Sequence, residues 1–193
     1  MKPIQFIALA ATITLLSIAC SDKKPTENSQ QTTEVIKAPT VSEQVSILSN
    51  SADSAWKATI LLDSQKFANI KRLIEEISYC KKYDEKAVEK ALKLTAEIKS
   101  FQYTQENLSD STITLYDTKT DELIRFVRNL KSNTAEITQH PLADQLENEI
   151  TEADGLLVTY RGNYDQAAIK YNSFLELNKE AIGVKKRLFS VPA

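Results

Sequence analysis

The clearest pattern of apolar positions lies in the last third of the chain, over residues 142–182. Apolar residues recur there at alternating spacings of four and three: Leu146, Ile150, Ala153, Leu157, Tyr160, Tyr164, Ala167, Tyr171 and Phe174. This spacing places them on one face of a helix that would be about 60 Å long at 1.5 Å per residue. Gly155 and Gly162 fall opposite that face, Pro141 suits the first helical position, and Gly183 suits the end. The pattern predicts one long amphipathic helix.

A second long helix is expected to begin after Pro39. The sequence Thr40-Val41-Ser42-Glu43 has the form of a capping box, in which Thr40 caps the helix and Glu43 reaches back to its backbone N–H. The seam that follows is apolar except for Asp63, and its members are Trp56, Ile60, Asp63, Phe67, Ile70, Ile74 and Ile77. The same spacing predicts a helix at the N-terminal end of the bundle.

Two shorter helices are predicted between these long ones, over about 84–101 and 113–130. The cap-rich stretch 107–111 and the polar stretch 133–141 separate the helices and fold the chain back on itself. No stretch alternates with period two, so the fold class is all-α. We expect residues 40–183 to form an elongated antiparallel bundle of three or four helices with long, coiled-coil-like helices. The breaks favour a monomer over a coiled-coil oligomer.

The N-terminus has the pattern of a secretory signal over residues 1–19. Lys2 precedes an apolar run of roughly 16 residues, which is short for a transmembrane span of about 20. The segment Leu16-Ser17-Ile18-Ala19-Cys20 resembles the lipobox of bacterial lipoproteins. The resemblance implies cleavage before Cys20, diacylglycerol on its thiol and a further acyl chain on the new amine, which together anchor a protein firmly. The alternative is an uncleaved anchor helix.

A lipidated Cys20 would place the rest of the chain outside the cytoplasm, in the bacterial cell envelope. Ser21 permits the outer membrane, facing the periplasm, as the site of anchoring. Residues 20–39 are polar and hold Pro25 and Pro39, so we expect a flexible tether. Because Cys20 would be modified, Cys80 has no partner for a disulfide within the chain, and it is expected to be a buried apolar residue or an exposed thiol.

Composition narrows the functional classes further. Three glycines and one histidine among 193 residues indicate neither a phosphate-binding loop nor a site with several His ligands, and two cysteines do not complete a zinc site. The net charge of -2 gives no reason to expect nucleic acid. We therefore expect no catalytic residues, no metal and no cofactor. His140 is expected to cap a helix or to be exposed.

The last residues, 184–193, form a basic tail that is also apolar. Lys185-Lys186-Arg187-Leu188-Phe189 could be attracted to anionic headgroups, but a frayed tail after Gly183 is the simpler interpretation.

The fourth predicted helix also carries a family resemblance. Residues 161–172 read Arg-Gly-Asn-Tyr-Asp-Gln-Ala-Ala-Ile-Lys-Tyr-Asn. This resembles the signature of the LemA family: an Arg followed by Tyr-Asn/Asp and Ala, with Tyr-Asn seven residues after the first Tyr. The resemblance extends over about residues 41–181. It implies an elongated helical bundle tethered to a bacterial membrane by its N-terminus, and it brings no established catalytic residues.

Two functions are consistent with these features. The first is a non-enzymatic scaffold or binding module for another envelope protein. Its candidate docking face consists of Tyr160, Arg161, Tyr164, Asp165, Tyr171 and Asn172. The second is a carrier whose bundle opens to take a lipid or a small apolar ligand. For the face itself, a packing role within the bundle is the conservative interpretation and docking is the sharper one.

Overall fold

The computed structural model describes residues 38–183 and 189–191. The predicted signal peptide, Cys20 and nearly all of the tether lie outside these residues, so lipidation stays a prediction. The described elements are the helices α1 (Val41–Ser78), α2 (Glu85–Ser100), α3 (Asp110–Ser132), the 3₁₀ turn η1 (Ala135–Gln139), α4 (Pro141–Leu177) and α5 (Lys179–Ile182). Every regular element in this part of the chain is helical, which confirms the predicted all-α bundle.

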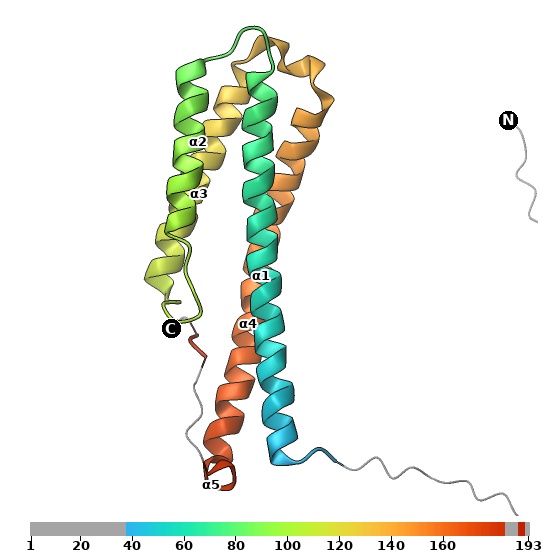
Figure 1. Ribbon diagram of the computed structural model, residues 1–193, viewed down its shortest axis with the longest axis vertical. Helices are drawn as coiled ribbons and strands as arrows, with labels where there is room; N and C mark the ends of the chain where they lie inside the picture. The colour runs from blue at the N-terminus through green and yellow to red at the C-terminus, as the bar shows by residue number, and fades with distance from the viewer. Residues whose placement is uncertain (1–37, 184–188, 192–193) are drawn as a thin grey trace, which may run out of the picture. The chain divides into compact units, whose positions relative to one another are not determined.

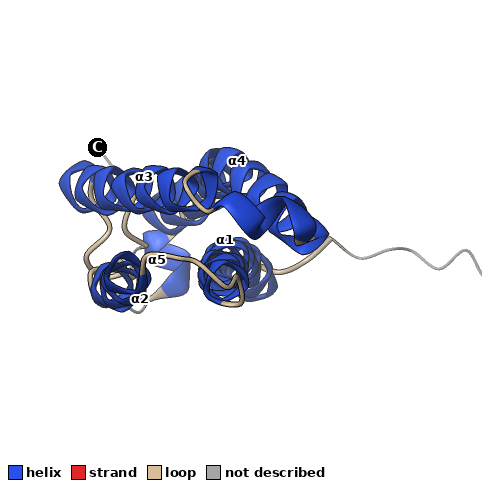
Figure 2. Ribbon diagram, turned by 90° about the horizontal axis from the view of Figure 1, so that it is seen from above, coloured by secondary structure: helices blue, strands red, loops and turns tan. Residues whose placement is uncertain are grey.

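The two long helices, α1 and α4, are antiparallel and pack side by side along their length (Figure 1). The shorter helices α2 and α3 lie beside only the half of this pair that contains the end of α1 and the start of α4. Seen end-on, the four helices form two rows, with α1 and α2 in one and α4 and α3 in the other (Figure 2). The bundle therefore has four helices in one half and mainly two in the other.

Local sequence explains where the helices begin. Thr40 caps α1 as predicted: its Oγ1 accepts from the Glu43 N–H at 3.3 Å, and Glu43 Oε2 accepts from the Thr40 N–H at 2.6 Å. Asp84 caps α2 through the Ala87 N–H. Ser109 begins α3 with a second capping box. Each side chain satisfies backbone donors that a helix N-terminus leaves unpaired.

The end of the last helix differs from the prediction of one helix to residue 182. α4 ends at Leu177, and Asn178 separates it from the single turn α5. The Asn178 side chain donates to the Phe174 carbonyl at 2.9 Å, a local bond of the kind by which asparagine competes with helix propagation. Gly183 then ends α5 with a positive φ of 65°, as expected for a glycine stop.

The predicted seams form most of the core. In α1, Phe67, Ile70, Ile74 and Ile77 are buried, whereas Trp56 and Ile60 are half-buried. In α4, Leu157, Tyr164 and Tyr171 are buried as predicted, and Tyr160 is half-buried. After Tyr164, two buried positions shift by one residue, from the predicted Ala167 and Phe174 to Ala168 and Leu175. A straight helix of 3.6 residues per turn drifts away from a strict seven-residue repeat, which accounts for the shift.

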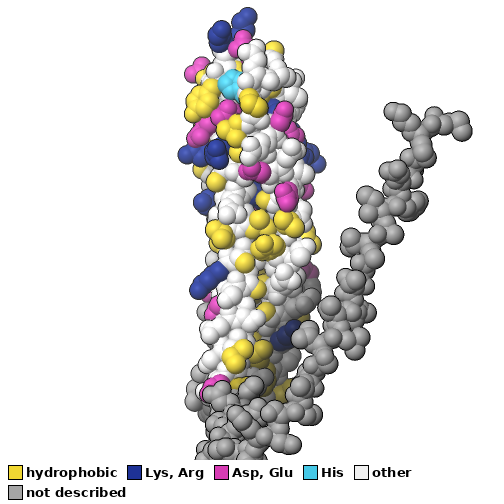
Figure 3. Space-filling view, turned by 90° about the vertical axis from the view of Figure 1, so that its right-hand side faces the viewer, with side chains coloured by type: hydrophobic (Ala, Val, Ile, Leu, Met, Phe, Trp, Pro, Cys, Tyr) yellow, Lys and Arg dark blue, Asp and Glu magenta, His cyan; other side chains and the backbone are white. Residues whose placement is uncertain are grey.

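On the face that Figure 3 shows, basic and acidic side chains are interspersed, and apolar side chains are scattered between them. None of the helices described is both long and apolar enough to span a bilayer.

Candidate functional site

The six residues of the predicted docking face do not form one open surface. Arg161 points to α3 and to the loop after α2, while Tyr164, Tyr171 and Asn172 contact the C-terminal residues 189–191. Tyr160 and Asp165 are half-buried. We describe the two groups separately.

Arg161 connects three parts of the chain. Its guanidinium donates two hydrogen bonds to the carboxylate of Asp117 on α3, at 2.6 and 2.7 Å. Its Nε donates to the hydroxyl of Tyr103 in the loop after α2, and its charged group also lies 5.0 Å from the centre of the Tyr103 ring. A two-point arginine–carboxylate pair fixes both distance and orientation, so Arg161 is one of the contacts that fix how α4 faces α3.

Tyr103 also belongs to a series of aromatic rings that contact one another inside the bundle. The Tyr103 ring is 5.3 Å from that of Tyr116 and 6.1 Å from that of Trp56, and Trp56 is 5.0 Å from Tyr164. Burial raises the pKa of Tyr103 to about 12, and burial together with the neighbouring Asp63 also raises the pKa of Tyr116. Both hydroxyls therefore stay protonated at neutral pH and act as hydrogen-bond donors or acceptors.

Asp63, which interrupts the apolar seam of α1, is the acceptor for this aromatic group. Its Oδ2 accepts from the Tyr116 hydroxyl at 2.5 Å and from Gln102 Nε2 at 2.9 Å. Its Oδ1 makes no hydrogen bond within the described structure but lies 3.2 Å from the ammonium of Lys66. Lys66 also donates to Asp154 of α4 at 3.0 Å. A buried acid and a buried base thus neutralise each other on α1, and the base also links α1 to Asp154 of α4.

These contacts form one continuous group, which we call the central network. Its members are Asp63, Lys66, Gln102, Tyr103, Tyr116, Asp117, Asp154 and Arg161. It crosses from α1 to α3, α4 and the loop after α2. Each of its charged groups faces an opposite charge, so the network can fix the register of the helices that it joins.

The second group is a side-chain site on α4, which we call the clasp: Tyr164, Tyr171 and Asn172. The Asn172 amide forms two hydrogen bonds with the backbone of Phe189, donating to its carbonyl at 2.8 Å and accepting from its N–H at 2.9 Å. The Tyr164 hydroxyl donates to the Ser190 carbonyl at 2.9 Å. The Phe189 ring lies 4.9 Å from the Tyr171 ring and 6.4 Å from the Tyr164 ring.

The clasp corrects the expectation of a frayed tail for the residues described. Phe189, Ser190 and Val191 are half-buried, and Phe189 and Val191 pack against the apolar core. Side chains of α4 donate hydrogen bonds to the carbonyls of both Phe189 and Ser190. These bonds satisfy backbone groups that regular secondary structure would otherwise pair, so the segment can be partly buried without it.

Asp165 is the member of the predicted face whose side chain has a buried oxygen without a hydrogen bond in the part of the chain that the structure describes. Its Oδ1 is buried and has no hydrogen-bond partner among the residues described. Burial raises the pKa of its carboxyl, a shift that the charge of Arg161 partly opposes. The ionised side chain is therefore a local cost to the fold at neutral pH.

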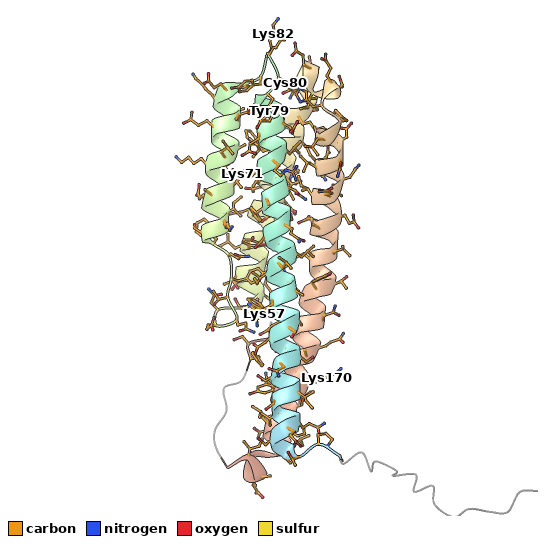
Figure 4. All side chains as sticks on the ribbon, turned by 45° about the vertical axis from the view of Figure 1, so that its right-hand side comes forward. Lys57, Lys71, Tyr79, Cys80, Lys82 and Lys170 are labelled. Atoms are coloured by element: carbon orange, nitrogen blue, oxygen red, sulfur yellow. The ribbon has the colours of Figure 1, made fainter. Side chains whose placement is uncertain are left out.

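Cys80 and His140, the other two residues considered in the sequence, both lie close to the ends of helices. Cys80 is buried at the turn after α1, between the labelled Tyr79 and Lys82 (Figure 4), and burial raises the pKa of its thiol. His140 occupies the position before α4, where its Nδ1 lies 3.3 Å from Glu76 Oε2. Within the described part of the chain, no three His, Cys, Asp or Glu side chains gather in a geometry that could hold a metal ion.

The sequence predictions do not include several members of these two groups. Of these, Lys66 could have been found, because it follows Asp63 by three residues, a spacing that brings two helical side chains together and indicates an ion pair at the seam. Tyr103 and Asp117 meet Arg161 only through the tertiary fold, and neither belongs to the predicted seams.

No family model, curated protein or solved structure matches the chain.

Proposed function

We propose that the chain is a lipid-anchored, non-enzymatic protein of the bacterial cell envelope, and that its bundle is a scaffold or binding module for another envelope protein. The observation that carries the binding part is the clasp, in which α4 holds a piece of polypeptide without regular secondary structure by hydrogen bonds to its backbone and by aromatic contacts. The anchoring part is supported by the lipobox-like segment that ends at Cys20. The signature over residues 161–172 supports divergent membership of the LemA family.

Anchoring is tested by Cys20→Ala. Lipidation through Cys20 would place the bundle outside the cytoplasm, with the outer membrane, facing the periplasm, as the favoured site. The variant should then either leave the membrane fraction or accumulate as an unprocessed precursor, and metabolic labelling with a fatty acid should be lost. Unchanged size and membrane retention in the variant would support an anchor helix instead and would overturn the lipoprotein part of the proposal.

Binding is tested by crosslinking in intact cells, followed by purification from membranes. We expect one defined envelope protein to be recovered with the wild-type chain, at a level above that of a control bait with the same signal segment and tether. Recovery of no protein above this control would overturn the scaffold hypothesis. The test does not depend on which face of the bundle is used.

A carrier of a lipid or small apolar ligand is the second candidate, and a groove between α2 and α3 favours it. The groove has a volume of 310 Å³, and its apolar lining consists of Leu94, Ile98, Leu123 and Phe126. Lys90 lies at its side with its ammonium 5.0 Å from the Phe126 ring. Native mass spectrometry of the purified protein should show a bound ligand if this hypothesis is right. A homogeneous ligand-free mass, with a wide panel of added lipids giving no adduct, would exclude it.

A further inference from the structure

The clasp holds its occupant mainly through atoms that every polypeptide has. Asn172 pairs with the N–H and the carbonyl of one residue, and Tyr164 pairs with the carbonyl of the next. Three of the contacts with residues 189–191 are therefore independent of the side chains of that segment. Such contacts give affinity for any extended chain, and pockets for alternate side chains give specificity.

Two side chains of the segment supply the specificity. The Phe189 ring packs on Tyr171 and Tyr164, and both Phe189 and Val191 pack against the core. Both side chains therefore lie against the bundle, although Ser190 separates them in the sequence. The site is therefore expected to favour a segment with an aromatic residue followed, two positions later, by an aliphatic residue.

We propose that the clasp is a binding site for an extended segment of a partner protein with the pattern aromatic–any–aliphatic, and that Phe189–Val191 occupy this site in the free protein. The inference rests on the proposed function, in which the bundle binds another protein, and it specifies where that protein docks and by what chemistry. A partner segment would make the same backbone hydrogen bonds with Asn172 and Tyr164.

The resident segment competes with any partner because it belongs to the same chain. A tethered segment acts at an effective concentration of the order of millimolar. A free peptide of equal intrinsic affinity is therefore at a disadvantage on the wild-type chain. Removing the Phe189 ring weakens the resident segment while leaving the clasp itself intact, so it should make the site accessible.

The test uses the full chain and a labelled peptide with the sequence of residues 184–193, Val-Lys-Lys-Arg-Leu-Phe-Ser-Val-Pro-Ala. Fluorescence anisotropy should show that the peptide binds the Phe189→Ala chain about tenfold more tightly than the wild-type chain. Trp56, the one tryptophan in the sequence, lies 5.0 Å from Tyr164 and gives a label-free signal for the same event.

Two controls identify the site. Adding Asn172→Ala to the Phe189→Ala chain should abolish binding, whereas adding Asn163→Ala, an exposed asparagine on the same helix, should leave it unchanged. A peptide in which the Phe is replaced by Ala should bind neither chain. Circular dichroism confirms that each variant is folded before it is titrated.

The inference is overturned if the folded Phe189→Ala chain does not bind the peptide, or if binding is insensitive to Asn172→Ala or to loss of the peptide ring. Its failure differs from that of the proposed function. If crosslinking recovers the same partner with wild type and Asn172→Ala, the scaffold stands and the clasp is not its docking site.

Discussion

Lys66→Met is the sharpest test of the central network, because Lys66 is the one base that contacts the buried Asp63 among the residues described. The side chains of Lys66 and Asp63 are 1% and 3% exposed, and 3.2 Å separates the ammonium from the carboxylate. Removing one partner of a buried pair leaves the other charge uncompensated, at a cost of about 3–5 kcal/mol. The second carboxylate, Asp154, is 36% exposed and can be solvated, so Asp63 carries most of this cost.

The measurement is urea denaturation followed by helical circular dichroism, with the midpoint and slope compared between variants. Lys66→Met should lower the free energy of unfolding by about 3–5 kcal/mol with little change in slope. Asp63→Asn in the same chain should recover at least about 1 kcal/mol, because it removes the orphaned charge and keeps an oxygen that can accept from Tyr116.

Lys71→Met is the matched control. Lys71 points away from α1 (Figure 4), is 64% exposed and lies 3.7 Å from Glu75, so its loss should change stability by at most about 0.5 kcal/mol. A cost below about 1 kcal/mol for Lys66→Met, or strict additivity with Asp63→Asn, would refute the assignment of a coupled buried pair.

Three further predictions concern single positions in the helices. Gly155→Ala and Gly162→Ala should each raise the free energy of unfolding by about 0.5–1 kcal/mol, because a Cβ at either position meets nothing within 4 Å; thermal unfolding that shows no gain would contradict this. Thr40→Ala should lower it by about 1 kcal/mol in urea denaturation. The hydrogen bond from the Thr40 N–H lowers the pKa of Glu43, so this cap contributes at neutral pH and weakens as acid protonates the carboxylate. Burial raises the pKa of Asp165 above 3.8, so its ionised form weakens the fold as pH rises through the raised pKa. Asp165→Asn should therefore stabilise the protein at pH 7, and a gain that persists unchanged in acid would contradict this reasoning.

The features that could be predicted from the sequence are those that depend on neighbours along the chain. The start of α1 depends on Thr40 and Glu43, three residues apart, and the core of α1 on a seam that repeats every three or four residues. Helix geometry allows the buried positions of α4 to shift after Tyr164, but which residues are buried there also depends on what packs against them. A periodic pattern states which face is apolar, but it does not state which elements remain to cover it.

The candidate site depends still more on contacts between distant residues. Tyr103 is 58 positions from Arg161, and Asp117 is 44 positions away, so no local rule pairs them. The prediction treated Tyr164, Tyr171 and Asn172 as one face with Arg161 because helical spacing unites them. The structure separates them because they meet different parts of the chain. Arg161 contacts Asp117 in the N-terminal part of α3, whereas Asn172, further along α4, contacts the C-terminal segment at Phe189.

The unequal lengths of the helices explain why the clasp lies where it does. α1 and α4 have 38 and 37 residues, whereas α2 has 16 and α3 has 23, so the long pair extends past the cover that the short pair provides. Two helices alone cannot bury both of their apolar faces, and Ile47 and Ile169 are more than half exposed there. Phe189 packs on Tyr171 within this two-helix half, beside a small apolar cluster formed by Val45 and Leu175. Under the proposed function, a partner's polypeptide that displaced Phe189 would cover the same rings of Tyr164 and Tyr171.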